Sequence, residues 1–367
     1  MKKTKPIAFL FFVLLLALQG NTQNYHLDSL TTMATSVPES SGLIYKDGRL
    51  VTHNDSGDQP KLYEIDTLNG FVQREVFVNN ASNVDWEDIT SDADHLYIGD
   101  IGNNYGSRTN LKIYKIMWSD FFERDTVEAQ EITYSYADQV DFSNNQFFTP
   151  YDAEALVAIG DSLFLFTKDW SAARTKVYAM PKTPGAYNLI AVDSFFVPAL
   201  ITGVDIAPSG NQLLFSAYSG QEALVFTLND FTAPHFSDGT PTTWPLPLTG
   251  SIKSEGICWR NSRFAYVSTE RVGTLPAVLY RLDTDFSSKL GLLYEHPLVK
   301  IYPQPATDKI RVEAEKVESL QLFSANGALV LQTGKTYLEV SHLPEGIYSL
   351  VILIERQSFA KQVIIAR

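Results

Sequence analysis

A five-fold internal repeat constrains the fold of this chain more than any other feature. In each copy an aliphatic residue is followed seven positions later by another apolar residue, and a polar turn rich in Asp, Gly, Asn and Ser separates the two. The pairs are Leu43 and Leu50, Ile89 and Leu96, Leu156 and Leu163, Ile206 and Leu213, and Ile257 and Phe264. Apolar segments around such turns predict five β-hairpins.

Each hairpin is followed by a third apolar segment with an aromatic residue at a matching place, and then by a more variable fourth segment. The aromatic residues are Tyr63, Tyr114, Tyr178, Phe226 and Tyr280. We therefore predict units of four antiparallel strands, which begin 46, 67, 50 and 51 residues apart. Such units are typical of a β-propeller, in which radial packing covers both faces of every sheet.

The predicted fold class is all-β, with a propeller domain over residues 25–297. Five blades are favoured, and six are possible if residues 118–150 hide a degenerate unit. The long second interval fits an insertion, "DQVDFSNNQFFTP", better than a hidden blade. We expect residues 25–36 to supply an outer strand that closes the ring against the last unit.

Acidic side chains recur just before the first anchor of the repeats. If the first strand of each unit is the innermost, alternate residues of these strands face the central axis. The position nearer the anchor holds Ser41, Glu87, Glu154, Val204 and Glu255. The position two residues earlier holds Glu39, Asp85, Asp152, Thr202 and Lys253. The repeat thus predicts an acidic central channel.

Crowded carboxylates repel one another, which raises their pKa values unless a cation compensates. Three interpretations stay open at this point. In the first, the acids are solvated in a water-filled channel. In the second, they bind Ca²⁺ or a similar hard cation, with Glu87, Glu154 and Glu255 as ligands. In the third, such a metal or a carboxylate pair carries out hydrolysis.

The loops after the second strands are polar and are expected to open at one mouth of the channel. Their candidate ligand-binding residues are His53, Asn54, Asp55, Asp100, Asn103, Asn104, Lys168, Asp169, Glu270 and Arg271. His53 is a possible general base or ligand, although a lone loop histidine is more often a turn residue. The glycines of "GDIGNNYG" do not open a helix, which excludes a phosphate-binding loop.

The first residues predict export. Lys2 and Lys3 precede an apolar run from Ile7 to Leu18 that closes on small and polar residues, which is the pattern of a secretory signal peptide over residues 1–22. The run is too short for a membrane-spanning helix, and no later segment is long enough, so we expect no transmembrane segment after signal removal.

Composition excludes some functions. The chain has a formal net charge of −13, which argues against a nucleic-acid partner, because phosphate binding needs a basic surface. Its single cysteine, Cys258, can form no internal disulfide and is expected to be a small buried hydrophobic residue.

After Pro297 the pattern changes to short alternating strands with Pro and Gly turns. These residues predict a small immunoglobulin-like β-sandwich over about 65 residues, with Asn326-Gly327 as a hairpin turn. Such a small domain is not expected to carry chemistry.

Two resemblances extend this interpretation. The segments "ESSGL…THNDSGDQPKLYEID", "DWEDI…LYIGDIGNN", "DAEAL…LFLFTKD", "ITGVDIAPSG" and "SEGI" resemble a family of uncharacterised exported bacterial β-propellers over about residues 36–290. In having acids at the axis, the chain is more distantly similar to calcium-dependent propeller phosphatases and lactonases.

The segments "YPQPATDKI", "LFSANGALVL", "VSHLPEGIYSLVI" and "AKQVIIAR" resemble the C-terminal sorting domain of the type IX secretion system, over residues 300–367. This resemblance implies Sec export followed by passage across the outer membrane, with the type IX machinery as partner. It also implies a secreted protein, or one attached to the outer-membrane surface.

Two classes of function remain at this stage. A binding module would hold a glycan, peptide, other small molecule or metal at the channel without turnover. A hydrolase would use a metal, most simply Ca²⁺, against a phosphoester, lactone or glycan. Because the sequence contains no recognised nucleophile motif, we favour binding and leave enzymatic activity open.

Overall fold

The computed structural model describes residues 25–169, 174–197, 199–220, 222–248, 253–284, 299–314, 316–324, 329–354 and 357–366. The predicted signal peptide, residues 1–22, lies outside them, as does the predicted turn at Asn326-Gly327. The described part of the chain is nearly all β, with one α-helix, α1 (Trp118–Glu123), and one 3-10 turn, η1 (Phe236–Asp238). None of its helices has the length and apolar character needed to cross a membrane.

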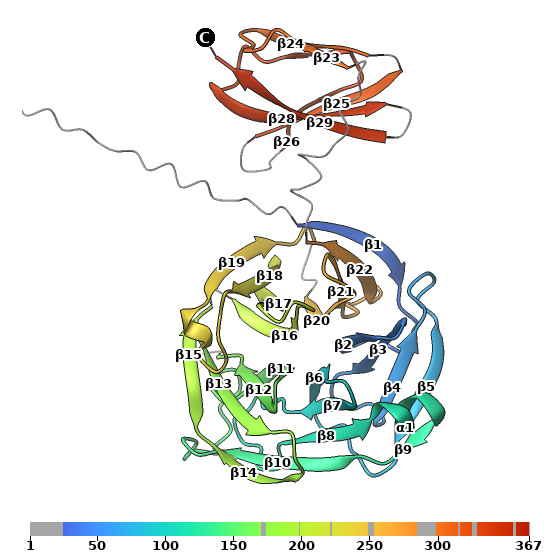
Figure 1. Cartoon of the computed structure of the whole chain (residues 1–367), viewed down its shortest axis with the longest axis vertical. Coiled ribbons are helices and arrows are strands. Elements are labelled where there is room, and N and C mark those ends of the chain that lie inside the picture. The colour runs from blue at the N-terminus through green and yellow to red at the C-terminus, as the bar shows by residue number, and fades with distance from the viewer. Residues whose placement is uncertain are drawn as a thin grey trace, which may run out of the picture.

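Five sheets surround a common centre, so the predicted propeller is confirmed with five blades in the described residues (Figure 1). From the centre outward, the first blade has β2 (Ser40–Lys46), β3 (Arg49–Asn54), β4 (Lys61–Ile65) and β5 (Val72–Val78). The second has β6 (Trp86–Ser91), β7 (His95–Asp100), β8 (Lys112–Met117) and β10 (Gln130–Tyr136).

The remaining blades follow the same order. The third has β11 (Ala153–Ile159), β12 (Ser162–Thr167), β13 (Arg174–Pro181) and β15 (Ala191–Phe196). The fourth has β16 (Leu200–Ile206), β17 (Gln212–Ser219), β18 (Glu222–Asn229) and β19 (Thr240–Pro245). The fifth has β20 (Ser254–Trp259), β21 (Phe264–Thr269), β22 (Val278–Asp283) and, outermost, β1 (His26–Thr32).

The N-terminal strand closes the ring. β1 pairs antiparallel with β22, from His26 opposite Asp283 to Thr32 opposite Val278. This confirms the closing strand expected from residues 25–36. β1 thereby becomes the outermost strand of the fifth blade, so this blade contains strands from both ends of the propeller domain.

Two short strands tie neighbouring blades together at their outer edges. β9 (Thr126–Val127) pairs parallel with β5 of the first blade, and β14 (Gly185–Leu189) pairs parallel with β10 of the second. Residues 118–150 therefore contain α1, β9 and the outer strand of the second blade. That stretch holds no sixth blade.

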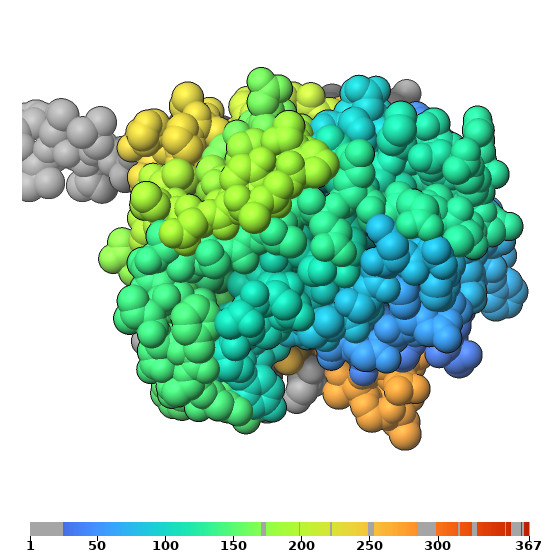
Figure 2. Space-filling view, turned by 90° about the horizontal axis from the view of Figure 1, so that it is seen from below, coloured from blue at the N-terminus to red at the C-terminus, as the bar shows by residue number. Residues whose placement is uncertain are grey.

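Apolar side chains fill the spaces between blades. Ile44, Leu62 and Val76 of the first blade share a core with Trp86 and Ile98 of the second, and equivalent clusters occupy the other four junctions. Figure 2 shows the ring from its edge, where the first, second and third blades form one continuous surface. Each sheet thus buries both faces, which explains why its strands are apolar on both.

The sole cysteine follows this pattern. Cys258 is fully buried in the cluster between the fifth and first blades, where burial raises the pKa of its thiol well above the usual value. It is a core residue, as predicted from its neighbours.

The blades approach closely at the inner strands, and glycine makes this possible. A Cβ at Gly256 of β20 would overlap the carbonyl oxygen of Ser41 in β2 and lie 2.6 Å from Ser268 Oγ. We expect Gly256→Ala to destabilise the ring by about 1–3 kcal/mol, the usual cost of overpacking. Chemical denaturation followed by tryptophan fluorescence measures this change, because all five tryptophans precede residue 260.

The control is Gly334→Ala, where a Cβ would meet nothing closer than Glu318 O at 3.7 Å. This variant should leave the fluorescence transition unchanged. A Gly256→Ala protein as stable as the wild type would mean that the junction can widen at no cost.

The C-terminal residues form two sheets around a core of their own. One sheet contains β23 (Lys300–Tyr302), β24 (Lys309–Glu313) and β27 (Tyr337–Glu339). The other contains β26 (Leu329–Thr333), β25 (Val317–Phe323), β28 (Gly346–Ile354) and β29 (Gln357–Ile365). Ile310, Leu338, Leu320, Leu350 and Val363 are buried between them, so the predicted small sandwich is confirmed.

Candidate functional site

The inner strand of every blade is irregular at the same place. The pairing register shifts between Ser40 and Leu43, Trp86 and Asp88, Ala153 and Ala155, Ile201 and Gly203, and Ser254 and Ile257. A bulge of this kind re-aims the side chain that it contains. Glu87, Glu154 and Glu255 all lie within these irregular segments, which places acids of three blades at the ring centre.

A cavity of about 380 Å³ lies at this centre. Its lining residues come from all but the fourth blade and from two long loops. They are Ser41, Asp55, Glu87, Asn104, Tyr105, Gln146, Phe147, Glu154, Lys168, Lys253, Glu255 and Glu270. Five carboxyl groups and two lysines make the cavity acidic.

Three carboxylates form a compact group on one side. One oxygen from each of Asp55, Asp85 and Glu87 lies within 4.8 Å of the others. Two oxygens bound to one Ca²⁺ can be at most about 5 Å apart, since each lies 2.3–2.6 Å from the ion. The spacing therefore suits a shared hard cation, and we call this group the carboxylate cluster.

The backbone beside the cluster leaves room for these side chains. A Cβ at Gly102 would overlap Glu87 Oε1 and lie 2.5 Å from Asp85 Oδ2. Glu87 is only 4% exposed, and its carboxylate has no hydrogen-bond partner among the described residues. A buried carboxylate without a partner is costly, so a ligand in the cavity would relieve that cost.

The electrostatics of the cavity agree with this geometry. Burial raises the pKa of Asp85 to about 7, with Asp55 and Asp152 adding repulsion. Burial and the nearby Glu154 raise the pKa of Glu87 well above its ordinary value. Burial and Glu270 raise the pKa of Glu255 to about 8. Without a bound cation, these acids hold protons that free carboxylic acids would release.

Two residues of the cavity lining, Lys168 and Glu154, form a buried ion pair. Lys168 Nζ lies 3.0 Å from Glu154 Oε2, with both side chains almost fully buried, and 5.2 Å from the ring centre of Tyr218. Burial lowers the pKa of Lys168, but Glu154 and the other anionic groups nearby together outweigh it and raise that pKa well above its ordinary value. Of the predicted ligands Glu87, Glu154 and Glu255, only Glu87 belongs to the carboxylate cluster in the described residues, and Glu154 is instead paired with Lys168.

His53 occupies a different place from the one predicted. It is fully buried, its ring stands edge-on to Trp86 at 5.6 Å between centroids, and its Nδ1 lies 3.0 Å from Asn54 O. Burial lowers the pKa of His53 to about 4. It does not line the cavity, so the geometry corrects its candidacy as base or ligand to a core role between the first two blades.

Other predicted residues brace the loops around the cavity without lining it. Asn54 donates to Ser36 O and to Asp58 Oδ2. Asp100 pairs with Arg108 at 2.7 Å and accepts a bond from the Asp85 N–H.

The remaining candidates also lie outside the lining. Asp152 accepts a bond from the Asn103 N–H. Glu39 is exposed and Asp169 is buried. Val204 is likewise buried in the core between the third and fourth blades, so the fourth blade brings no acid to the centre.

Sequence reasoning missed three residues of the lining, namely Tyr105, Gln146 and Phe147. They lie in the loop after β7 and in the insertion before β11, neither of which belongs to the repeat. The aromatic residues within "NNQFF" were the one available signal, since adjacent exposed aromatic side chains often mark a binding site.

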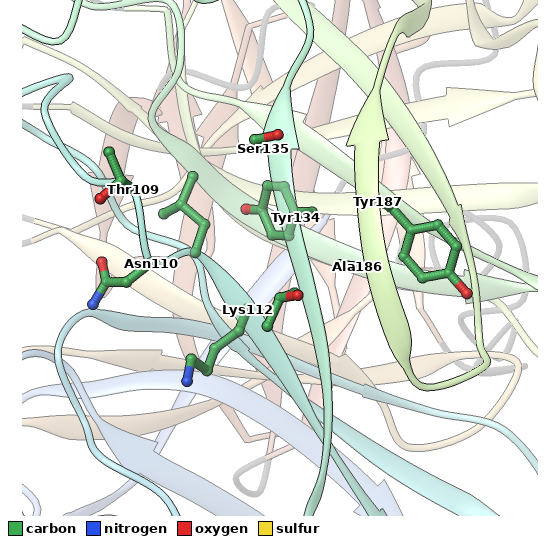
Figure 3. A pocket seen from close by; sticks show the side chains of 9 residues that line it. Thr109, Asn110, Lys112, Tyr134, Ser135, Ala186 and Tyr187 are labelled. Carbon is green, nitrogen blue, oxygen red and sulfur yellow. The ribbon is translucent and has the colours of Figure 1, made fainter.

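A second cavity, of about 400 Å³, lies on the second blade. Figure 3 shows Thr109, Asn110 and Lys112 on one side of it and Tyr187 of β14 on the other. Its one lysine, Lys112, is paired with Glu131 at 3.0 Å. None of the predicted site residues lines this cavity, and it has no cluster of titratable groups.

Comparison with known proteins defines the C-terminal domain. Residues 300–366 match the family model described as the secretion system C-terminal sorting domain. The protein is thus a cargo of the type IX secretion system, exported to the cell surface or beyond it. No curated protein matches the chain.

Solved structures with a related arrangement are remote. An exo-β-1,3-galactanase from Phanerochaete chrysosporium is 9% identical, covering 93% of this chain and 94% of that chain, with a TM-score of 0.45. A TolB-like protein from Agrobacterium tumefaciens is 11% identical, covering 89% and 91%, with a TM-score of 0.36. A periplasmic gluconolactonase from Pseudomonas aeruginosa is 13% identical, covering 89% and 99%, with a TM-score of 0.34. Similarities at this level say nothing about ligand or activity.

Proposed function

We propose that the propeller of this exported protein is a binding module whose central cavity holds one divalent cation, most simply Ca²⁺, at Asp55, Asp85 and Glu87. The observation that carries the proposal is the carboxylate cluster, with its oxygens within 4.8 Å of one another. Hard cations select oxygen ligands of this kind. A signal peptide over residues 1–22 would deliver the chain to the first membrane.

The buried negative charge of the carboxylate cluster favours a bound cation over a water molecule at this position. The unpartnered carboxylate of Glu87 and the raised pKa of Asp85 both reflect repulsion and burial that a cation would offset. A bound ion would displace the protons and hold the three groups charged. Gly102 leaves the space into which these carboxylates project.

Isothermal titration of the mature full-length chain with CaCl₂ tests the proposal. We expect one site per chain, and at about 100 times the Kd a gain of about 2.7 kcal/mol, or 5–10 °C in the tryptophan-detected Tm. In Glu87→Gln the affinity should fall at least tenfold. Without metal at pH 8, the same variant should be more stable than the wild type, because glutamine avoids the cost of either ionising the buried Glu87 carboxyl group or keeping its proton at that pH.

The matched control is Glu123→Gln, an exposed carboxylate at the end of α1. It should bind Ca²⁺ as the wild type does. Absence of binding heat with Ca²⁺, Mg²⁺, Mn²⁺ and Zn²⁺, or full retention of binding in Glu87→Gln, would contradict the proposal.

A metal-assisted hydrolase is the second candidate, and one observation favours it. Asp85 and Glu255 have pKa values of about 7 and about 8, the range in which a carboxyl group works as general acid or base near neutral pH. Turnover of a phosphoester, lactone or glycan that is lost in Glu255→Gln, with Ca²⁺ affinity unchanged, would move the assignment from binding module to enzyme.

A further inference from the structure

Two loops from outside the repeat form one wall of the central cavity. The insertion before β11 is hydrogen-bonded to the loop after β7 through Asn145 N to Tyr105 O at 2.9 Å and Phe147 N to Asn104 O at 3.0 Å. Gln146 Nε2 donates to the Tyr105 hydroxyl at 3.0 Å. We call Asn104, Tyr105, Gln146 and Phe147 the aromatic rim.

Further bonds fix the rim from behind. Gln139 Nε2 donates to Gly106 O at 2.7 Å, in a buried position. Asn103 donates its backbone N–H to Asp152 and its side-chain amide to Tyr151 O. The rim is therefore held in place before any ligand arrives, which lowers the entropy cost of binding.

Phe147 adopts an unusual backbone conformation. Its φ is +59°, whereas the other non-glycine residues with positive φ in the described chain are Asp47, Asp230 and Lys316. Bulky residues seldom enter this region, and doing so costs about 1–2 kcal/mol. Burial of the Phe147 side chain does not offset this conformational cost, because the residue is 44% exposed. Strain of this kind is often kept where it serves a site.

The chemistry of the rim is mixed. Tyr105 and Phe147 present two aromatic rings, each 44% exposed, to the cavity. Beside them are the side-chain amides of Asn104 and Gln146, which donate and accept hydrogen bonds. Lys253 and Glu270 lie on the wall as well. Flat apolar faces beside paired donors and acceptors suit a ligand whose rings carry hydroxyl groups.

We propose that the aromatic rim binds a neutral saccharide, with a sugar ring stacked on Tyr105 and Phe147 and its hydroxyls bonded to the rim amides and to the cavity acids. This inference rests on the proposed binding function and names its ligand class. The cavity volume of about 380 Å³ lies at the small end of the range for ligand sites, so it accepts the end of a glycan chain rather than its middle.

The negative charge of the cavity determines which polysaccharides are expected to bind. Its lining has five carboxyl groups against two lysines, and Asp85 and Asp152 are close enough to repel Glu87 of the lining. Anionic polysaccharides are repelled by such a field, whereas uncharged hydroxyls gain acceptors. Neutral glycans are therefore expected to bind and uronate-rich glycans are not.

Affinity electrophoresis of the full-length chain tests this inference. Native gels contain dextran, laminarin, xylan or mannan as neutral probes and alginate as the anionic probe, each with CaCl₂ or with EDTA. We expect retardation by at least one neutral polysaccharide and none by alginate. Titration with the matching oligosaccharide then gives the affinity, which should fall at least tenfold in Tyr105→Ala and in Phe147→Gly.

Phe147→Gly separates binding from folding. Glycine accepts positive φ freely, so this variant should keep the wild-type Tm or exceed it while it loses the saccharide. The control is Phe71→Ala, an exposed aromatic residue on the turn before β5, which should bind as the wild type does.

Three results would overturn the inference. They are absence of retardation by every neutral probe, wild-type affinity in both rim variants, and rim-dependent binding of alginate or of a lysine-rich peptide in place of the neutral probes. If Ca²⁺ still binds in the first case, the proposed cation site stands and only the saccharide is lost. Saccharide binding that survives EDTA and Glu87→Gln would show that the aromatic rim binds its ligand without the cation, and the CaCl₂ titration alone would then decide the cation site.

Discussion

Replacing Asp88 by alanine should lower the free energy of unfolding of the propeller by about 3–5 kcal/mol, because several buried N–H groups lose their acceptor. Asp88 is fully buried on β6. Its Oδ1 accepts from Ile89 N, and its Oδ2 accepts from Leu156 N at 2.9 Å and Val204 N at 3.1 Å. One carboxyl group thus joins the second, third and fourth blades.

Urea denaturation followed by tryptophan fluorescence measures the loss. Asp205→Ala is the graded comparison, since Asp205 reaches only one other blade, through Trp259 N at 2.7 Å, and should lose less. Asp94→Ala, on the exposed turn between β6 and β7, should change stability by less than about 0.5 kcal/mol. Equal stability of Asp88→Ala and Asp94→Ala would show that the blades do not depend on this junction.

Raising the pH from 5 to 8 in EDTA should destabilise the propeller by at least about 3 kcal/mol, or at least about 6 °C in Tm. The pKa values of Asp85 and Asp205 are raised to about 7, and that of Glu255 to about 8, in each case mainly by burial. The folded protein therefore keeps protons that the unfolded chain releases near pH 4. This stability is complete below pH 4 and is lost as the pH rises through 7 to 8.

Acids with lowered pKa values act in the opposite direction but in another window. Although burial raises it, bonds from Tyr97 and Lys182 hold the pKa of Asp92 well below its usual range, so its contribution is lost only in strong acid. Saturating CaCl₂ should flatten the slope between pH 5 and pH 8, and Asp85→Asn should reduce it. A Tm that is constant or rises over that interval in EDTA would contradict the assigned burial of these acids.

The ring could be predicted from the sequence because each blade repeats the same constraint. The anchor pairs, the matching aromatic residues and the turn chemistry all follow from burying two faces of a four-stranded sheet. The closing role of residues 25–36 followed from the open edge of the last unit. The parallel strands β9 and β14 could not be foreseen, since they lie in connections that the repeat does not constrain.

The site was only partly predictable for a related reason. Glu87, Glu154 and Glu255 share a repeat position, so their convergence could be expected. The placement of Glu87 in the carboxylate cluster and of Glu154 in an ion pair depends on Asp55 and Lys168, which come from loops after the second strands.

The position of His53 shows the limit of a local pattern. A polar neighbourhood in sequence, "THNDSGD", suggested a solvent-facing loop, but His53 is a fully buried residue of β3. Likewise the aromatic rim forms by contact between two loops about 40 residues apart in sequence. Neither loop belongs to the repeated pattern, so the repeat could not predict their contact.

The pairing of β1 with β22 has a consequence for the timing of biosynthesis. The two strands are about 250 residues apart, so the last blade cannot be completed until Asp283 has left the ribosome. At ordinary rates of about 5–20 residues per second, synthesis up to that residue takes about 15–55 s. Throughout that interval the ring cannot close, because the partner strand of β1 has not yet been made.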